Sequence, residues 1–275
     1  CSDGGKGQTV IIRGEAGVGK SRLVEEFGKL ASSKNFAIHT GLILDFGTAK
    51  GEDAISALVR SLLDIPRGGD RVIRAEAADR ALKMGWVIEE RTVHLNDLLD
   101  LPQPSNLAGI YEAMDNTTHN LGKQETLSDL IQSKSETTYL LLRIEDAHWA
   151  DQVILAHLAH LVRAVQSIPV LLIVTSRITG DQLDQNWRAG TEGAPLMAID
   201  LSPLDSSEAS DLAQYFGDLD EDVISACVER SGGNPLFLEQ LLRNADELTA
   251  GNIPGTIQGI VQARLDALNL SLIHI

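Results

Sequence analysis

The sequence predicts an α/β fold with a mostly parallel sheet flanked by helices. Short runs rich in apolar and β-branched residues alternate with stretches in which apolar residues recur at helical spacing. The runs lie at residues 9–13, 36–40, 138–144, 170–175 and 196–201. The third and fourth runs are almost unbroken, as expected of strands covered on both faces. Alternating strands and helices need crossover connections, and these favour parallel pairing.

Helical spacing separates most of these runs and then continues alone to the end of the chain. Helices are expected at residues 21–30, 53–63 and 153–165. Residues 66–134 are mixed and mostly helical, without clear element boundaries. After Pro203 only helices are expected, at residues 206–216, 221–230, 236–244 and 256–268. The sequence therefore predicts an α/β domain over residues 1–202 and a small helical lid over residues 203–252.

The charge balance narrows the choice of partners. The chain has 39 acidic and 23 basic residues, a formal net charge of -16, which argues against a broad electrostatic grip on nucleic acid or anionic lipid. No apolar run is long enough to span a membrane. The two cysteines, Cys1 and Cys227, cannot form a disulfide framework, so a reducing cytoplasm fits best. Phosphate binding must therefore be local, with neither direct nucleic acid binding nor membrane association expected.

Both ends of the chain look cut. The first residue is Cys1 and not methionine, so the natural start is expected upstream. Residues 270–275 read LSLIHI, which the transposon end used in preparing sequencing libraries can encode. This segment is expected to be a non-native sequencing-adapter tail and is excluded from the predicted fold. A natural apolar helix end is the alternative.

A glycine-rich loop joins the first predicted strand to the first predicted helix. Residues 14–21 read GEAGVGKS, which satisfies the pattern of glycine, four residues, glycine, lysine and serine. Glycines let backbone N–H groups turn inward around phosphates, and the helix that follows adds the positive end of its dipole. The candidate nucleotide-binding residues are Gly14, Glu15, Ala16, Gly17, Val18, Gly19, Lys20, Ser21 and Arg22. A glycine turn that merely precedes a helix is the alternative.

ATP and Mg²⁺ are the ligands that this loop predicts. Lys20 is expected to reach the β and γ phosphates, and the Ser21 hydroxyl is expected to ligate Mg²⁺. Glu15 and Arg22 belong to the segment, but their side chains are expected to face solvent or to make local pairs.

Two carboxylates end the third predicted strand, Glu145 and Asp146. A loop of this kind needs a second acid on a neighbouring strand, because the water shell of the metal is anchored from the side opposite the serine. Glu145 is expected to hold Mg²⁺ through water, and Asp146 to orient or polarise the attacking water, although the two roles could be exchanged. Ordinary solvated acids at a strand end are the alternative. Asp151 is expected to cap the helix that begins near residue 153.

With the loop and the segment EDAHWAD at residues 145–151, the chain resembles the STAND signalling ATPases within the wider AAA-like class. VTSR at residues 174–177 looks like the sensor segment of that family, and GGNPLFLE at residues 232–239 looks like its lid motif. The resemblance implies that Arg177 faces the γ-phosphate, that Pro235 lies against the adenine, and that ATP is preferred over GTP. A surface arginine, and a helix stop followed by a restart, would explain the same two segments without a nucleotide.

Four further segments resemble ATPase regions that follow class III adenylate or guanylate cyclase domains in large bacterial regulators. They are LDFG at residues 44–47, GEDAI at 51–55, IPGTIQ at 253–258 and ARLD at 263–266. In that family a winged helix and helical repeats usually follow, so residues 253–269 are expected to begin a truncated winged helix. The upstream segment that usually helps to hold the adenine is missing from this chain.

The function predicted first is an ATP-dependent switch module of a multidomain signal-transduction protein. Slow hydrolysis is expected, because no arginine finger can be assigned from the sequence. The expected partners are other domains of the parent protein, namely a winged helix, helical repeats and a cyclase domain, and nucleotide-dependent self-association is left open. Cyclase activity would belong only to the parent. The alternatives are a nucleotide-binding scaffold without hydrolysis and the ATPase module of a transcription regulator.

Overall fold

The computed structural model describes residues 5–43, 54–216 and 219–243. The chain divides into two compact units. The sheet unit comprises Cys1–Arg13 and Ser21–Ile199, and the lid unit comprises Gly14–Lys20 and Asp200–Ile275. The expected start of a winged helix and the expected adapter tail lie outside the described residues, as do the LDFG segment and most of GEDAI.

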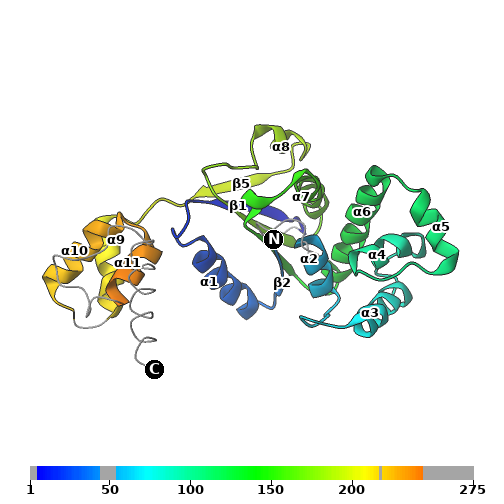
Figure 1. Cartoon of the computed structure of the whole chain (residues 1–275), viewed down its shortest axis with the longest axis horizontal. Coiled ribbons are helices and arrows are strands. Elements are labelled where there is room, and N and C mark those ends of the chain that lie inside the picture. The colour runs from blue at the N-terminus through cyan, green and yellow to red at the C-terminus, as the bar shows by residue number, and fades with distance from the viewer. Residues whose placement is uncertain (1–4, 44–53, 217–218, 244–275) are drawn as a thin grey trace, which may run out of the picture. The chain divides into compact units, whose positions relative to one another are not determined.

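In the described part of the chain, the sheet unit has five strands. They are β1 (Gln8–Arg13), β2 (Ala37–Leu42), β3 (Leu140–Glu145), β4 (Val170–Ser176) and β5 (Leu196–Asp200). Their order across the sheet is β2-β3-β4-β1-β5. Figure 1 labels β1, β2 and β5 of this sheet. The pairs β2–β3, β3–β4 and β4–β1 are parallel, which confirms the expected α/β architecture. The carboxyl ends of β1, β3 and β4 therefore lie at one edge of the sheet.

Helices connect these strands. They are α1 (Lys20–Ser33), α2 (Ala54–Leu62), α3 (Arg71–Lys83), η1 (Glu89–Arg91), α4 (Thr92–Leu98), α5 (Ser105–Ala113), α6 (Asn116–Ser135), η2 (Ala147–Trp149), α7 (Gln152–Val165) and α8 (Gln185–Ala189). The stretch without predicted boundaries thus contains α3 to α6. Asp151 caps α7, since its carboxylate accepts from the Ile154 N–H at 2.8 Å, and this confirms the predicted cap. No helix in the described ranges is long and apolar enough to cross a membrane.

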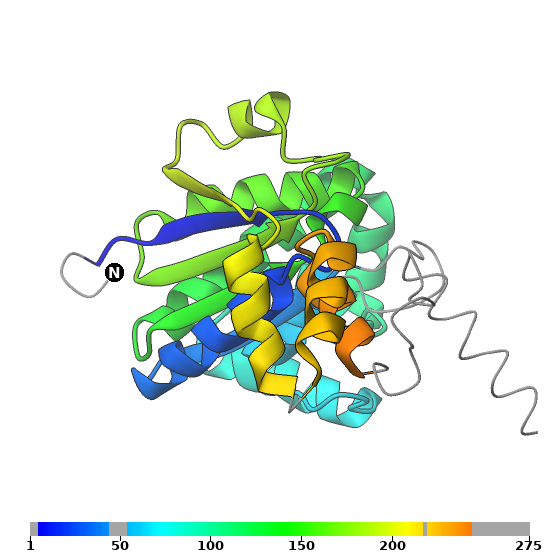
Figure 2. The ribbon, with the colours of Figure 1, turned by 90° about the vertical axis from the view of Figure 1, so that its left-hand side faces the viewer.

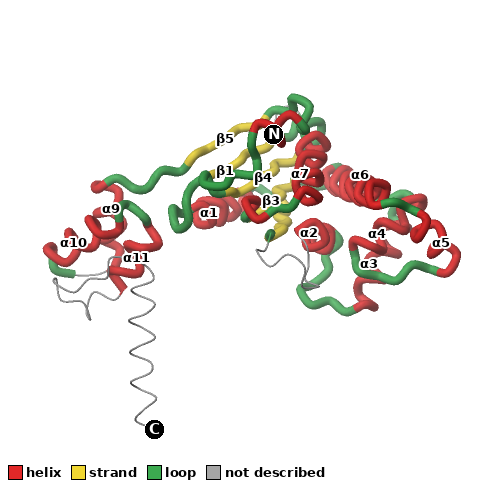
Figure 3. The backbone as a smooth tube through the Cα atoms, turned by 45° about the horizontal axis from the view of Figure 1, so that its top comes forward, coloured by secondary structure: helices red, strands yellow, loops and turns green. Residues whose placement is uncertain are grey.

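The two faces of the sheet carry different helices. Successive side chains of a strand point to opposite faces, and Leu142 and Ile144 of β3 belong to a core shared with α2, α6 and α7. Arg143, between them, points to the other face. A β-carbon added at Gly28 of α1 would lie 3.3 Å from its guanidinium Nη1. Figure 3 shows α1 on one side of the strands and α2 and α7 on the other.

The lid unit contains α9 (Ser206–Ala213), η3 (Gln214–Phe216), α10 (Glu221–Ser231) and α11 (Pro235–Arg243). Its three α-helices pack side by side (Figure 2) around a core of their own. The buried residues of that core are Ala209, Ala213, Cys227, Phe237, Leu238, Leu241 and Leu242. A capping box begins α9, because the side chains of Asp205 and Glu208 each accept from the backbone N–H of the other. Gly232 ends α10 in the left-handed conformation that glycine adopts readily.

Candidate functional site

The phosphate loop consists of residues Gly14–Lys20, between the end of β1 and the first turn of α1. Gly17 and Gly19 have φ angles of 80° and 104°, which glycine adopts without the steric cost of a side chain. A β-carbon on Gly14 would lie 2.7 Å from Val18 Cγ1. The three glycines of the predicted motif are therefore required by the local geometry of the loop.

Lys20 places a cation among the backbone groups of this loop. Only 8% of the residue is exposed, and its Nζ donates to the carbonyl oxygens of Gly14 at 2.7 Å and Glu15 at 3.1 Å. A positive charge held in this partly desolvated position attracts an anion more strongly than one in bulk water does. Ser21 follows in the first turn of α1 and is exposed. Arg22 makes the local pairing expected of it, with Glu26 at 2.9 Å.

The lid segment, residues 233–236, donates two hydrogen bonds to the phosphate loop. Asn234 Nδ2 donates to the Ala16 carbonyl at 2.9 Å, and the Leu236 N–H donates to the Gly17 carbonyl at 3.2 Å. Pro235 is the first residue of α11, where its missing N–H and fixed φ suit a helix start. The structure thus brings the predicted Pro235 next to residues that contact the predicted loop.

The acid edge consists of Glu145, which ends β3, and Asp146, which follows it. Partial burial raises the pKa of the Glu145 carboxyl above its ordinary value; Arg143 opposes this rise, and the neighbouring charge of Asp146 adds to it. A raised pKa means that the carboxylate form is costly here and that a nearby cation would stabilise it. The Asp146 side chain is 43% exposed, so water reaches this carboxylate.

The backbone of Asp146 is in the left-handed region, with φ 62° and ψ 43°. Few residues other than glycine adopt this conformation, although aspartate does so more readily than most. The Asp146 N–H donates to Thr175 Oγ1 at 3.0 Å, and Thr175 is 2% exposed on β4. This bond joins the ends of β3 and β4, and strained residues that a buried partner fixes in this way cluster at functional sites.

Arg177 lies directly after β4, and its side chain contacts the segment that follows Asp146. Its guanidinium carbon lies 5.3 Å from the centre of the Trp149 ring, and that ring lies 4.8 Å from the ring of His148. Stacking engages the flat face of a guanidinium and leaves its N–H groups directed sideways. The sheet unit therefore gathers Glu145, Asp146 and Arg177 from two adjacent strands.

A polar network fixes the end of β1, immediately before the phosphate loop. Arg13 pairs with Asp181 at 3.0 Å, and the Asp181 side chain is only 12% exposed. Ser176, the last residue of β4, donates from Oγ to Asp181 Oδ1 at 3.1 Å. Because these bonds are shielded from solvent, they hold the adjacent ends of β1 and β4 more firmly than an exposed pair would.

The described residues do not form a complete metal site by themselves, but some of them could share Mg²⁺ with a phosphate ligand. Within the described residues, no group of three or more His, Cys, Asp or Glu side chains could hold a metal ion. Mg²⁺ usually keeps several waters and takes one or two protein ligands together with substrate phosphates. Ser21 and Glu145, both in the sheet unit, match that requirement better than an all-protein cage would.

Comparison with known families identifies the family of this chain. The family described as AAA ATPase domain matches residues 1–174, which include the phosphate loop, the acid edge and most of β4. The chain belongs to the AAA ATPase domain family.

Two individual proteins similar to this ATPase domain place it in context. A curated protein of Rhizobium meliloti (strain 1021), described as uncharacterized protein R02095, is 25% identical over 248 residues, which are 86% of this chain and 22% of that protein. The chain thus spans about a fifth of the length of this relative. The crystal structure of Cdc6p from Pyrobaculum aerophilum has a TM-score of 0.52 at 14% identity, over 90% of this chain and 57% of that one. At this identity the likeness concerns the fold alone.

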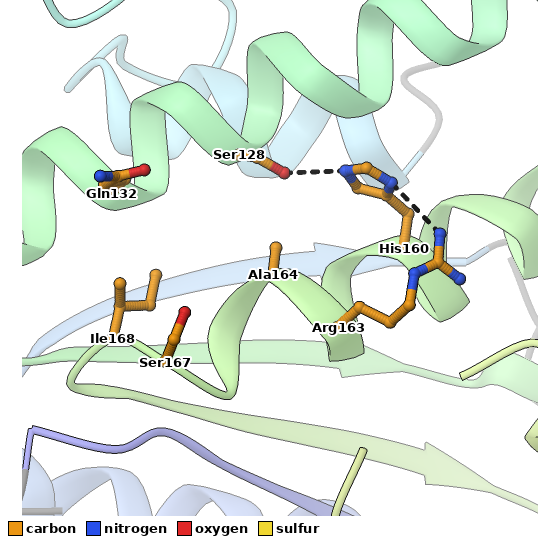
Figure 4. Close-up of a pocket in the computed structure, with 7 residues that line it drawn as sticks. All are labelled: Ser128, Gln132, His160, Arg163, Ala164, Ser167 and Ile168. Carbon is orange, nitrogen blue, oxygen red and sulfur yellow. Dashed lines mark hydrogen bonds between the residues drawn. The ribbon is translucent and has the colours of Figure 1, made fainter. Parts of the chain in front are cut away.

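The ATPase domain also has a pocket of about 500 Å³ between α6 and α7 of the sheet unit (Figure 4). It is lined by Ser128, Gln132, His160, Arg163, Ala164, Ser167 and Ile168. None of the predicted site residues is among them. His160 Nε2 is hydrogen-bonded to Ser128 Oγ at 3.0 Å, and Arg163 is engaged with the Gly190 carbonyl and with Glu192. The pocket is therefore separate from the predicted site, and its main polar groups already have partners.

Sequence reasoning misses two residues that hold the site, Thr175 and Asn234. Thr175 lies inside the VTSR segment, where only Arg177 is a predicted site residue. Asn234 precedes Pro235, and asparagine before a proline-led helix is a recognisable N-cap signal. That signal predicts the start of α11 but not the contact with Ala16.

Proposed function

We propose that this AAA ATPase domain binds Mg-ATP through residues 14–21 and hydrolyses it slowly, as the switch module of a multidomain signalling protein. The observation that carries the proposal is the phosphate loop, in which glycines with positive φ surround a buried lysine between a strand and a helix. This combination directs backbone N–H groups, a helix N-terminus and a cation at phosphate. Lys20 would exchange the carbonyls of Gly14 and Glu15 for phosphate oxygens.

Ser21 and Glu145 are the proposed ligands of Mg²⁺, with Glu145 acting through water. The raised pKa of Glu145 supports this role, because a carboxylate that is costly to ionise gains most from a cation beside it. Mg²⁺, when bound, would neutralise charge on the phosphate oxygens.

Asp146 is the proposed group that orients the attacking water. Its side chain is 43% exposed, and its backbone is fixed by Thr175, so its carboxylate could accept a water proton from a defined position. The exchange of roles between Glu145 and Asp146 remains part of the proposal.

Arg177 is proposed to contact the γ-phosphate of the nucleotide, and Pro235 is proposed to contact its adenine. Stacked on Trp149, Arg177 keeps N–H groups for charge-assisted hydrogen bonds to a γ-phosphate, and hydrolysis would remove them. Pro235 presents an apolar ring at the start of α11, suited to the flat face of adenine. The lid would thereby differ between ATP-bound and ADP-bound states.

A longer parent protein is part of the proposal, because the matched region is 22% of the Rhizobium meliloti relative. The resemblance to ATPase regions of cyclase-type regulators suggests signal transduction as the setting. A cytoplasmic location is proposed from the absence of a disulfide framework in a sequence with two cysteines.

The first test is calorimetric titration of nucleotide-free protein with Mg-ATP, beside Lys20→Ala. Saturable binding by the wild type and its loss in Lys20→Ala are expected, with circular dichroism showing that both proteins are folded. Equal binding by the two proteins would rule out the proposed site.

Phosphate release then separates hydrolysis from simple nucleotide binding. Slow release by the wild type and none by Asp146→Asn are expected, while Asp146→Asn still binds Mg-ATP. Release that is unchanged in Asp146→Asn would remove this residue from the reaction. Tight binding without release by the wild type would indicate a nucleotide-binding scaffold.

A further inference from the structure

We propose that Asn234 is a positioning residue that holds the phosphate loop in its nucleotide-binding shape and so couples the loop to the lid. The inference rests on the proposed function, because it concerns the same nucleotide site. It goes further because it assigns a role to Asn234, which belongs neither to the loop motif nor to the residues proposed to contact adenine.

Two consecutive peptide groups of the loop are held by the lid segment. Asn234 Nδ2 binds the Ala16 carbonyl at 2.9 Å, and the Leu236 N–H binds the Gly17 carbonyl at 3.2 Å. In a trans peptide the C=O and the N–H that share a bond point in opposite directions. The N–H groups of Gly17 and Val18 are therefore turned away from the lid segment and toward the interior of the loop, where the Val18 N–H makes a long hydrogen bond to the Glu15 carbonyl at 3.4 Å. Phosphate oxygens would replace that carbonyl as the acceptor.

The first turn of α11 uses one of these bonds for its own capping. The first backbone donors of a helix have no partner inside the helix, and each one here is accounted for. Pro235 has no N–H, Leu236 donates to Gly17 of the loop, and the Phe237 N–H donates to Asn234 Oδ1 at 3.1 Å. The loop thus supplies one of the caps of α11.

One side chain performs two tasks through two atoms. Oδ1 of Asn234 caps α11, while Nδ2 holds the loop at Ala16. Aspartate and serine are comparable helix caps, but their side chains do not offer an amide donor together with the capping oxygen. Asparagine is therefore the residue that satisfies both contacts.

Gly17 and Gly233 make room for this arrangement. A β-carbon at Gly17 would lie 2.6 Å from Asn234 Oδ1 and 2.9 Å from Nδ2. A β-carbon at Gly233 would lie 2.2 Å from the Leu204 carbonyl oxygen, and the Leu204 N–H donates to the Gly233 carbonyl at 2.8 Å. Neither glycine therefore has room for a β-carbon while Asn234 contacts the loop.

The decisive variant is Asn234→Ser, which keeps a helix-capping oxygen and removes the donor to Ala16. The measurement is the Kd for Mg-ATP by calorimetry, together with the melting temperature of the nucleotide-free protein. Lys20→Ala is the control that is expected to lack the nucleotide-binding site. Asn106→Ser is the matched control, because Asn106 is exposed on α5 of the sheet unit.

Asn234→Ser is expected to bind Mg-ATP about 3- to 10-fold more weakly, the effect of one hydrogen bond. Its apo melting temperature should stay close to that of the wild type, because water can replace this exposed bond in the nucleotide-free protein. Asn234→Ala is expected to show the same loss of affinity and also a lower apo melting temperature, because it removes the cap as well. Asn106→Ser should match the wild type in both.

The outcomes separate this inference from the function beneath it. If the wild type binds, Lys20→Ala does not, and Asn234→Ser binds as well as or better than the wild type, then the positioning role is wrong and the proposed function stands. An Asn234→Ser variant whose loss of affinity only follows a lower apo melting temperature would show a structural role. If the wild type itself fails to bind, both proposals fall.

Discussion

The phosphate loop and the acid edge would act on the same nucleotide, yet the protein fixes them by different means. The loop is crowded, since its glycines have positive φ and a β-carbon at Gly17 would lie 2.6 Å from Asn234 Oδ1. The acid edge is held by a side chain, since Thr175 accepts the Asp146 N–H. The loop should therefore be most sensitive to added atoms, and the acid edge to the loss of a polar group.

The largest effect is expected from Gly17→Ala. Alanine at φ 80° costs about 1–2 kcal/mol, and crowding in a packed site adds about 1–3 kcal/mol, because the β-carbon would lie 2.6 Å from Asn234 Oδ1. Urea unfolding of the nucleotide-free protein should show a loss of about 2–5 kcal/mol, the sum of the backbone cost and the crowding cost.

Gly19→Ala separates the two causes within the same loop. Its φ of 104° is also unfavourable for alanine, but a β-carbon there would meet no atom within 4 Å. Gly17→Ala should be the more destabilising of the two, and Asn234→Gly should recover part of its loss. Equal losses for the two alanines, without recovery, would show that Asn234 does not crowd the loop.

Thr175→Val tests the other half of the comparison. Valine keeps the shape of threonine on β4 but leaves the Asp146 N–H without its acceptor, which costs about 1–2 kcal/mol. Urea unfolding measures this loss, and phosphate release should fall with it, because Asp146 would lose its fixed backbone. Thr9→Val is the matched control, since Thr9 is also a buried threonine, on β1, and its hydroxyl has no hydrogen bond to any residue in the described ranges. A similar loss in both variants would show that the cost lies in packing.

A smaller effect is expected from Asp205→Ala, which weakens the lid without touching the loop. Loss of the capping box of α9 costs about 1 kcal/mol, so the melting temperature should fall while the Kd for Mg-ATP stays near that of the wild type. The exposed Asp211→Ala, within the same helix, should change neither quantity. A clear loss of affinity in Asp205→Ala would mean that the loop depends on the whole lid and not on the lid segment.

The strands were predictable because each is a short run rich in apolar and β-branched residues, and the runs that form β3 and β4 are almost unbroken. All five predicted strands exist, with ends shifted by at most two residues. The helices at residues 66–134 escaped placement for a physical reason. The buried residues of α3 are only Ala77, Ala78 and Ala81, which are too small to give a strong periodic signal. In α6 the large buried residues lie only in the second half of the helix.

The same contrast applies to the site. The phosphate loop could be predicted because its mechanism is contained in eight consecutive residues. The contacts that fix the loop and the acid edge could not be predicted, since Asn234 and Ala16 are 218 positions apart and Asp146 and Thr175 are 29 apart. Hydrogen bonds of this kind depend on the order of strands and on the path of the lid, which periodicity does not encode.

The smallest effect concerns pH and involves a single proton, on Glu145. Burial raises the pKa of this carboxyl above 4.5 in the folded protein, against the opposing influence of Arg143. Between pH 4.5 and the raised pKa, the folded state therefore binds more protons at this site than the unfolded state does. The contribution of Glu145 to stability should accordingly rise as the pH falls through this window.

Protonation of Glu145 should weaken Mg²⁺ binding, because the metal needs the carboxylate. The effect of falling pH on Mg²⁺ binding is therefore opposite to its effect on stability. As the pH falls through the raised pKa, wild-type affinity for Mg-ATP should fall more steeply than that of Glu145→Gln, while wild-type stability relative to this variant should increase. Calorimetry and urea unfolding across the pH series measure the two slopes, and the variant removes the titration of ATP itself from the comparison. Parallel affinity curves would show that Glu145 does not hold the metal, and the role would then pass to Asp146, the neighbour that Thr175 fixes.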